Sequence, residues 1–204
     1  MAATVADEPY RRVRAYSTPQ CPPGWTSTPE RAGDKNSLDI FKNAAHKLDI
    51  QHDVEIGELG PVRCIRIHTN IDRTQVRVNS VRYNIRDLDV KICVTERNRL
   101  IVDTWLDYVK DKRTVVFCAS VRHAEQIAAL FKERGVAAAA VSGSMKTSER
   151  NETLAKFASG ELNVLCACDL LNEGWDCPET EVLFMARPTM SKVLYLQQLG
   201  RGMR

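Results

Sequence analysis

The chain has 204 residues, of which 44% are hydrophobic and 27% are charged, so it can bury the core of one domain or slightly more. The formal net charge is only +3, which is too small to indicate nucleic-acid binding by itself. No apolar run approaches the roughly 20 residues of a transmembrane helix, and residues 1–10 lack the pattern of a signal peptide. We therefore expect a soluble, cytoplasmic protein.

The first sixty residues differ in composition from the rest. Four prolines crowd one stretch, at Pro19, Pro22, Pro23 and Pro29. Apolar residues between Ser37 and Leu48 predict one amphipathic helix. The first strand is expected at Val62–His68, where Ile65 and Ile67 are β-branched.

From there on, apolar runs of strand length alternate with segments of helical periodicity. The expected helices are Glu96–Val109, Val121–Arg134, a helix capped by Thr147 or Ser148 that runs to Phe157, and Ser191–Leu199. The expected strands are Thr114–Cys118, Val136–Val141, Asn163–Ala167 and Glu181–Met185. Leu100, Ile101, Trp105, Leu106 and Val109 form the apolar stripe of the first helix, and Gly135 ends the second in the left-handed conformation. This order predicts an α/β domain with a parallel sheet flanked by helices.

The seven cysteines include no C-x-x-C pair. A zinc site or a disulfide framework normally shows closer ligand spacing, so we predict no metal site. Cys118, Cys166 and Cys168 lie in apolar, strand-like runs, where free cysteine behaves as a small hydrophobic side chain.

Ligands of open parallel sheets bind beyond the carboxyl ends of the strands. The segments that follow the expected strands are rich in small and polar residues, and they should meet at one edge of the sheet. Hydroxyl groups and glycines there allow close approach of a nucleic-acid backbone, although each also suits an ordinary turn or helix cap. The candidate nucleic-acid contacts are Ser120, Ser142, Gly143, Ser144 and Thr189.

Two further segments carry chemistry. Gly174 and Asp176 flank Trp175, so that a turn residue and a carboxylate interrupt an apolar stretch. The chain ends on Q-x-x-G-R-x-x-R, formed by Gln197, Gly200, Arg201 and Arg204. Two arginines three residues apart share one face if the segment is helical, and their guanidinium groups suit phosphate oxygens.

These segments resemble the superfamily 2 DEAD/DEAH-box-type helicases, in the branch similar to the helicase subunits of restriction enzymes. Val115–Ala124 resembles motif IV, Val164–Pro178 motif V, and Gln197–Arg204 motif VI. The resemblance implies a RecA-like second domain and ATP bound between two such domains. Gly174, Asp176, Gln197 and Gly200 would then line the nucleotide, and Arg201 and Arg204 would be catalytic arginine fingers.

The family's P-loop and acidic box are absent from the sequence, so the magnesium that accompanies ATP would be held by another RecA-like domain. Thr26–Arg31 resembles motif III, which normally ends the first domain. We therefore expect residues 1–60 to be a poorly ordered remnant of the end of that domain with a linker, and residues 61–204 to be the second domain.

The resulting hypothesis is an ATP-dependent helicase or translocase acting on DNA, with RNA as the alternative substrate. The chain alone is expected to be inactive. Two other hypotheses remain open at this stage, a non-catalytic module that binds nucleic acid and a truncated gene product.

Overall fold

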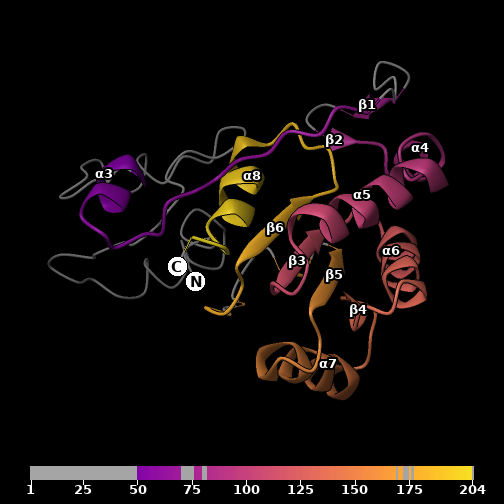
Figure 1. Cartoon of the computed structure of the whole chain (residues 1–204). Coiled ribbons are helices and arrows are strands. Elements are labelled where there is room, and N and C mark those ends of the chain that lie inside the picture. The colour runs from indigo at the N-terminus through magenta and orange to yellow at the C-terminus, as the bar shows by residue number, and fades with distance from the viewer. Residues whose placement is uncertain are drawn as a thin grey trace, which may run out of the picture.

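The computed structural model describes residues 50–69, 76–79, 82–168, 170–171, 175 and 177–203 (Figure 1). The predicted helix at Ser37–Leu48 and the motif III-like Thr26–Arg31 lie outside these residues. The described chain begins with the short helix α3 (Ile50–Glu55) and a two-stranded antiparallel pair, β1 (Val78–Asn79) and β2 (Arg82–Tyr83). Within the described part, no helix is both long and apolar enough to cross a membrane.

A four-stranded parallel sheet forms the centre of the molecule. Its strands are β3 (Thr114–Phe117), β4 (Ala138–Ser142), β5 (Val164–Cys168) and β6 (Val182–Met185), in the spatial order β4-β5-β3-β6. All three strand pairs are parallel. The two central strands are buried along their whole length and, apart from Thr114, apolar, as expected when helices cover both faces. The predicted α/β fold is confirmed.

Helices cover the two faces of the sheet. The helices α5 (Thr95–Tyr108) and α6 (Val121–Glu133) pack on one face, and α7 (Thr147–Ser159) lies on the other (Figure 1). Alternate residues of β3 point to opposite faces, so Val116 joins the α5–α6 core while Val115 joins the α7 core. The smaller helix α4 (Ile85–Lys91) precedes α5, and α8 (Lys192–Leu199) follows β6.

The core beneath α5 is ordered by one aromatic pair. The rings of Trp105 and Phe131 meet edge to face, with centroids 5.4 Å apart. The indole N–H of Trp105 donates to the Thr114 hydroxyl at 2.7 Å, so its polar atom is satisfied inside the core. Cys118 and Cys166 fill the remaining space as buried free thiols, as predicted.

The helix ends follow local chemistry, with one correction. The Ser120 hydroxyl accepts the His123 N–H at the start of α6, and Gly135 has a φ of +77° just beyond its end, as predicted. The expected capping of α7 by Thr147 or Ser148 is wrong, because the N-cap position is Lys146 and no side chain caps this end. No side-chain hydrogen bond therefore stabilises the start of α7.

Two further predictions are wrong, one of a strand and one of a buried side chain. Val62–His68 is an exposed, irregular segment rather than a strand, because none of the described residues pairs with its backbone (Figure 1). β-Branched residues favour extended structure, but a strand persists only where a partner supplies hydrogen bonds. Leu100, expected on the buried stripe of α5, is 37% exposed, and the helix packs instead through Ile101, Val102 and Trp105.

Candidate functional site

The four segments that follow the sheet strands begin at one edge. Phe117 is in register with Ala167 and with Met185, and Ser142 is in register with Cys168. Since all four strands run parallel, their carboxyl ends meet at this edge, as the sequence predicted. This edge, hereafter the carboxyl edge, collects every described candidate for nucleic-acid contact.

The segment after β4 presents its polar groups outward. Gly143 and Ser144 are exposed, and a Cβ atom added at Gly143 would meet nothing within 4 Å. Ser142 is only 4% exposed, and its Oγ lies 2.9 Å from the Oγ of Ser144. Gly143 and Ser144 are therefore the accessible part of this candidate contact.

The segment after β3 is fixed by hydrogen bonds of Ser120 to neighbouring residues of the fold. The Ser120 hydroxyl donates to Asp89 of α4 and accepts the His123 N–H at 3.1 Å. Ser120 is 8% exposed, so its hydroxyl serves the fold at this position. Its contact with nucleic acid stays a prediction.

A buried polar network lies directly beneath this segment. The Nδ1 atom of His123 accepts the Ala119 N–H at 3.1 Å, so the ring proton resides on Nε2 and points to the Asn98 Oδ1, 3.0 Å away. Burial of the imidazole, and secondarily the charge of Arg97, lower the pKa of His123 to about 4. His123 is therefore neutral at physiological pH.

Sequence reasoning did not identify this network. His123 entered only as part of a motif, and Asn98 and Arg97 were not selected. The available signal was a pair of polar residues, Asn98 and His123, within otherwise apolar helical stripes. Their burial, at 2% and 0% exposure, shows that they satisfy each other across α5 and α6.

The segment after β6 is tied to the same region. Arg97 donates from its Nη2 atom to the Ala186 carbonyl at 2.8 Å, which joins α5 to the end of β6. The Thr189 Oγ1 accepts the Ser191 N–H at 3.1 Å, and the Ser191 hydroxyl in turn caps α8. Thr189 therefore shapes the turn that starts α8.

Arg201 lies just beyond the last helix. α8 ends at Leu199, as predicted, and Arg201 lies in the turn that follows it. The Arg201 guanidinium donates to the backbone carbonyl of Trp175. This contact brings together the segments that resemble motifs V and VI. Gln197 is half-buried on α8, and Gly200 has an ordinary right-handed φ of −61°.

The two sets of candidates lie at opposite ends of α8. The helix begins next to the carboxyl edge and runs back beside β6 (Figure 1). Its eight residues span about 12 Å. Arg201 and Gly202 follow its far end, where a Cβ added at Gly202 would lie 2.8 Å from the Leu183 Cγ. The arginine is thus separated from Gly143, Ser144 and Thr189.

Three predicted site residues, Gly174, Asp176 and Arg204, fall outside the described residues. Trp175 between the first two is described, and its ring packs against Phe157 at a centroid distance of 6.2 Å. Among the described residues there is no group of three or more His, Cys, Asp or Glu that could hold a metal ion.

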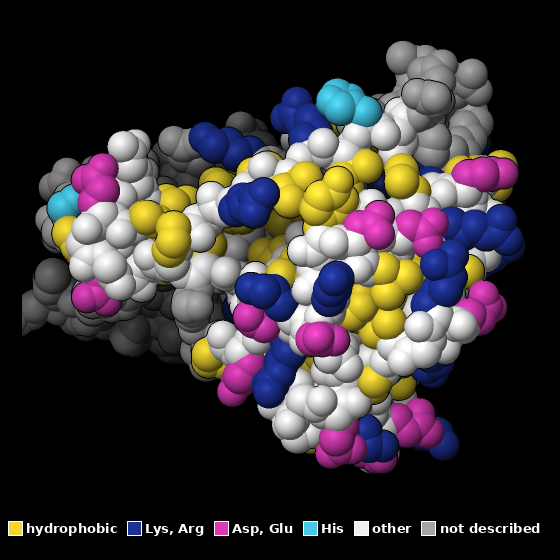
Figure 2. All heavy atoms as spheres, viewed as in Figure 1, with side chains coloured by type: hydrophobic (Ala, Val, Ile, Leu, Met, Phe, Trp, Pro, Cys, Tyr) yellow, Lys and Arg dark blue, Asp and Glu magenta, His cyan; other side chains and the backbone are white. Residues whose placement is uncertain are grey.

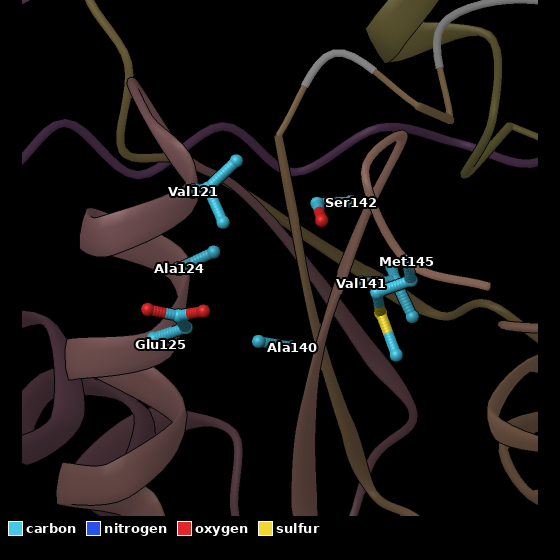
Figure 3. A pocket seen from close by; sticks show the side chains of 7 residues that line it. All are labelled: Val121, Ala124, Glu125, Ala140, Val141, Ser142 and Met145. Atoms are coloured by element: carbon cyan, nitrogen blue, oxygen red, sulfur yellow. The ribbon is translucent and has the colours of Figure 1, made fainter. Parts of the chain in front are cut away.

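A small hollow opens between α6 and the end of β4. Its volume is about 150 Å³. Figure 3 shows the side chains of α6 on one side of it and those of β4 and the following loop on the other. The lining residues are Val121, Ala124, Glu125, Ala140, Val141, Ser142 and Met145.

Charges of both signs are mixed on one face of the molecule. Figure 2 shows lysine and arginine side chains interspersed with aspartate and glutamate on the face in view. This mixture agrees with the net charge of +3.

Comparison with known proteins decides the family. The model described as "Helicase conserved C-terminal domain" matches residues 96–204, more than half of the chain. The chain belongs to this helicase family. The resemblance to superfamily 2 helicases is thereby confirmed.

Named relatives agree with this assignment. The chain is 28% identical over 185 residues to IRC3 of Saccharomyces cerevisiae, which is named as a candidate ATP-dependent helicase, and 26% identical over 137 residues to the Escherichia coli type I restriction enzyme EcoAI endonuclease subunit. These matches cover 89% and 59% of the chain, which spans 27% and 17% of the two relatives. The Pyrococcus furiosus Hef helicase domain is 27% identical, with a TM-score of 0.41, over 52% of this chain and 22% of that one.

Proposed function

We propose that residues 61–204 form the second motor domain of an ATP-dependent helicase or translocase that acts on DNA, with residues 1–60 as the end of a first domain and a linker. The observation that carries the proposal is the hydrogen bond from Arg201 to the Trp175 carbonyl. It fixes the orientation of a guanidinium group in a segment that also contains Gln197 and Gly200. A planar, permanently charged guanidinium is suited to the oxygens of a transferring phosphoryl group.

The arrangement separates two tasks. Gly143, Ser144 and Thr189 at the carboxyl edge would contact the nucleic-acid backbone. Arg201 would meet ATP beyond the far end of α8, and Arg204, Gly174 and Asp176 are proposed to contact the nucleotide with it. ATP supplies the phosphoryl group, and its magnesium ligands belong to a first RecA-like domain. Among the described residues, the oriented guanidinium of Arg201 supports this division.

The test is ATP turnover with a first RecA-like domain supplied in trans. We expect no turnover from this chain alone and DNA-stimulated turnover from the mixture. The Arg201→Ala variant should lower turnover on the order of 10³-fold, because an arginine finger contributes about that much or more. Its binding to single-stranded DNA should remain, since Arg201 lies away from the carboxyl edge.

The matched control is Arg99→Ala, which removes an exposed arginine from α5. It should leave turnover unchanged. ATP hydrolysis by the chain alone would contradict the proposed division of the site. Turnover stimulated only by RNA would overturn the choice of DNA, and DNA binding without turnover in the mixture would indicate a non-catalytic binding module instead.

A further inference from the structure

We infer that the hollow between α6 and β4 is a subsite for a nucleobase that carries an amino group, and this inference rests on the proposed contact with single-stranded nucleic acid. The hollow adjoins the exposed Gly143 and Ser144, which are candidate contacts for the strand backbone. A base attached to that backbone is the nearest group that can turn into the hollow.

The size of the hollow limits its occupant. Its volume of about 150 Å³ is well below the roughly 300–1,000 Å³ of pockets for drug-sized ligands. It therefore accommodates one planar ring rather than a whole nucleotide. A ring entering from the carboxyl edge would pass the 36%-exposed Val121 at the start of α6.

The walls suit an aromatic ring. Val121 and Ala124 of α6 face Ala140 and Ser142 of β4 across the gap, whereas Val141 and Met145 pack with the core on the α7 face of the sheet (Figure 3). The apolar surface of Val121, Ala124 and Ala140 favours the flat face of a base over a hydrated phosphate. Stacking on such surfaces is tolerant of sequence, so the walls alone would not discriminate between bases.

Glu125 would discriminate between bases that carry an amino group and bases that do not. Its exposed carboxylate lines the hollow and forms no ion pair with any described residue. A carboxylate repels phosphate and accepts hydrogen bonds from an amino group such as cytosine N4. Thymine has a single N–H group that lies between two carbonyl oxygens. The carboxylate repels both of these oxygens. The charge of Glu125 therefore selects an amino-bearing base.

The test is fluorescence anisotropy of the full chain with 15-nucleotide deoxycytidine and deoxythymidine oligomers at low salt and pH 8. We expect tighter binding of the cytidine oligomer by about five- to tenfold, since the carboxylate can accept a hydrogen bond from the cytosine N4 amino group. The Glu125→Gln variant should reduce this ratio to near one.

The matched control is Glu133→Gln, which makes the same change of charge at an exposed position near the other end of α6. It should strengthen binding of both oligomers slightly and preserve their ratio. Equal binding of the two oligomers by the unaltered chain, or the same ratio in both variants, would overturn the subsite while leaving the proposed nucleic-acid contact standing. Failure to bind either oligomer would refute the proposed contact, and the subsite with it.

Discussion

At the residue scale, Gly202 is required by packing rather than by backbone conformation. An added Cβ would lie 2.8 Å from the Leu183 Cγ and 2.9 Å from its Cδ1. Gly202→Ala should therefore lower the free energy of unfolding by about 1–3 kcal/mol, the usual cost of overpacking. Urea denaturation measures this change.

The cause can be isolated by a double-mutant cycle with Leu183→Ala. If the clash with Leu183 is responsible, Gly202→Ala should cost much less in that background. Equal costs in the two backgrounds would show that the loss arises elsewhere.

The same stretch shows what residue-level reasoning could predict. The motif at Gln197–Arg204 identified Arg201, and the structure places its guanidinium on the Trp175 carbonyl. The predicted end of the last helix at Leu199 is confirmed, in keeping with the low helix propensity of Gly200 and Gly202 that follow it. The partner of Arg201 lies 26 residues away and could not be inferred from spacing.

At the scale of elements, Arg113 compensates for an unsatisfied helix end. Its Nη1 donates to the Ala158 carbonyl at 2.7 Å in the last turn of α7, just before Gly160. Arg113→Ala should destabilise the protein by about 1 kcal/mol through loss of this hydrogen bond. Thermal unfolding followed by circular dichroism measures the change.

The neighbouring Lys112→Ala is the control, because the Lys112 ammonium forms an exposed ion pair with Glu181 at 3.5 Å. Exposed pairs contribute between about 0 and 1 kcal/mol, so this variant should be nearly neutral. Equal losses in the two variants would rule out a specific role for Arg113 at the end of α7.

Helices and strands were predictable where the periodicity of apolar residues in the sequence agrees with their burial in the structure. Each sheet strand and each of α5 to α8 lies within a few residues of its expected range, because apolar runs alternate with helical stripes there. Val62–His68 failed because strand formation depends on a partner, which local sequence does not specify.

At the scale of the whole molecule, the buried His123 links stability to pH. Its pKa is about 4 in the folded protein and 6.5 ordinarily, so the unfolded chain binds more protons between these values. Stability is fully present above pH 6.5 and should fall by on the order of 2–3 kcal/mol as the pH drops towards 4. Urea denaturation from pH 7.5 to 4 measures this slope.

His123→Gln keeps a polar side chain but cannot titrate. It should be less stable than the unaltered chain at pH 7.5, because the fit to Asn98 and Ala119 is lost, yet its stability should change less between pH 6.5 and 4. An unchanged slope would assign the pH dependence to other groups.

The global arrangement was predictable in outline. Alternating strands and helices imply a parallel sheet, which in turn implies one edge for the loops. The sequence did not reveal that α8 separates the carboxyl edge from Arg201, since that separation depends on how the helix packs beside β6. Nor did it reveal the hollow, which forms only when α6 meets the end of β4.

The packing of Trp105 has a practical optical consequence. Its indole is 2% exposed and its N–H is bonded to Thr114, so its emission should lie at short wavelength in the folded state and shift to the red when water reaches the ring. Because α5 and β3 meet at this ring, intrinsic fluorescence provides a label-free readout for the denaturation experiments described above.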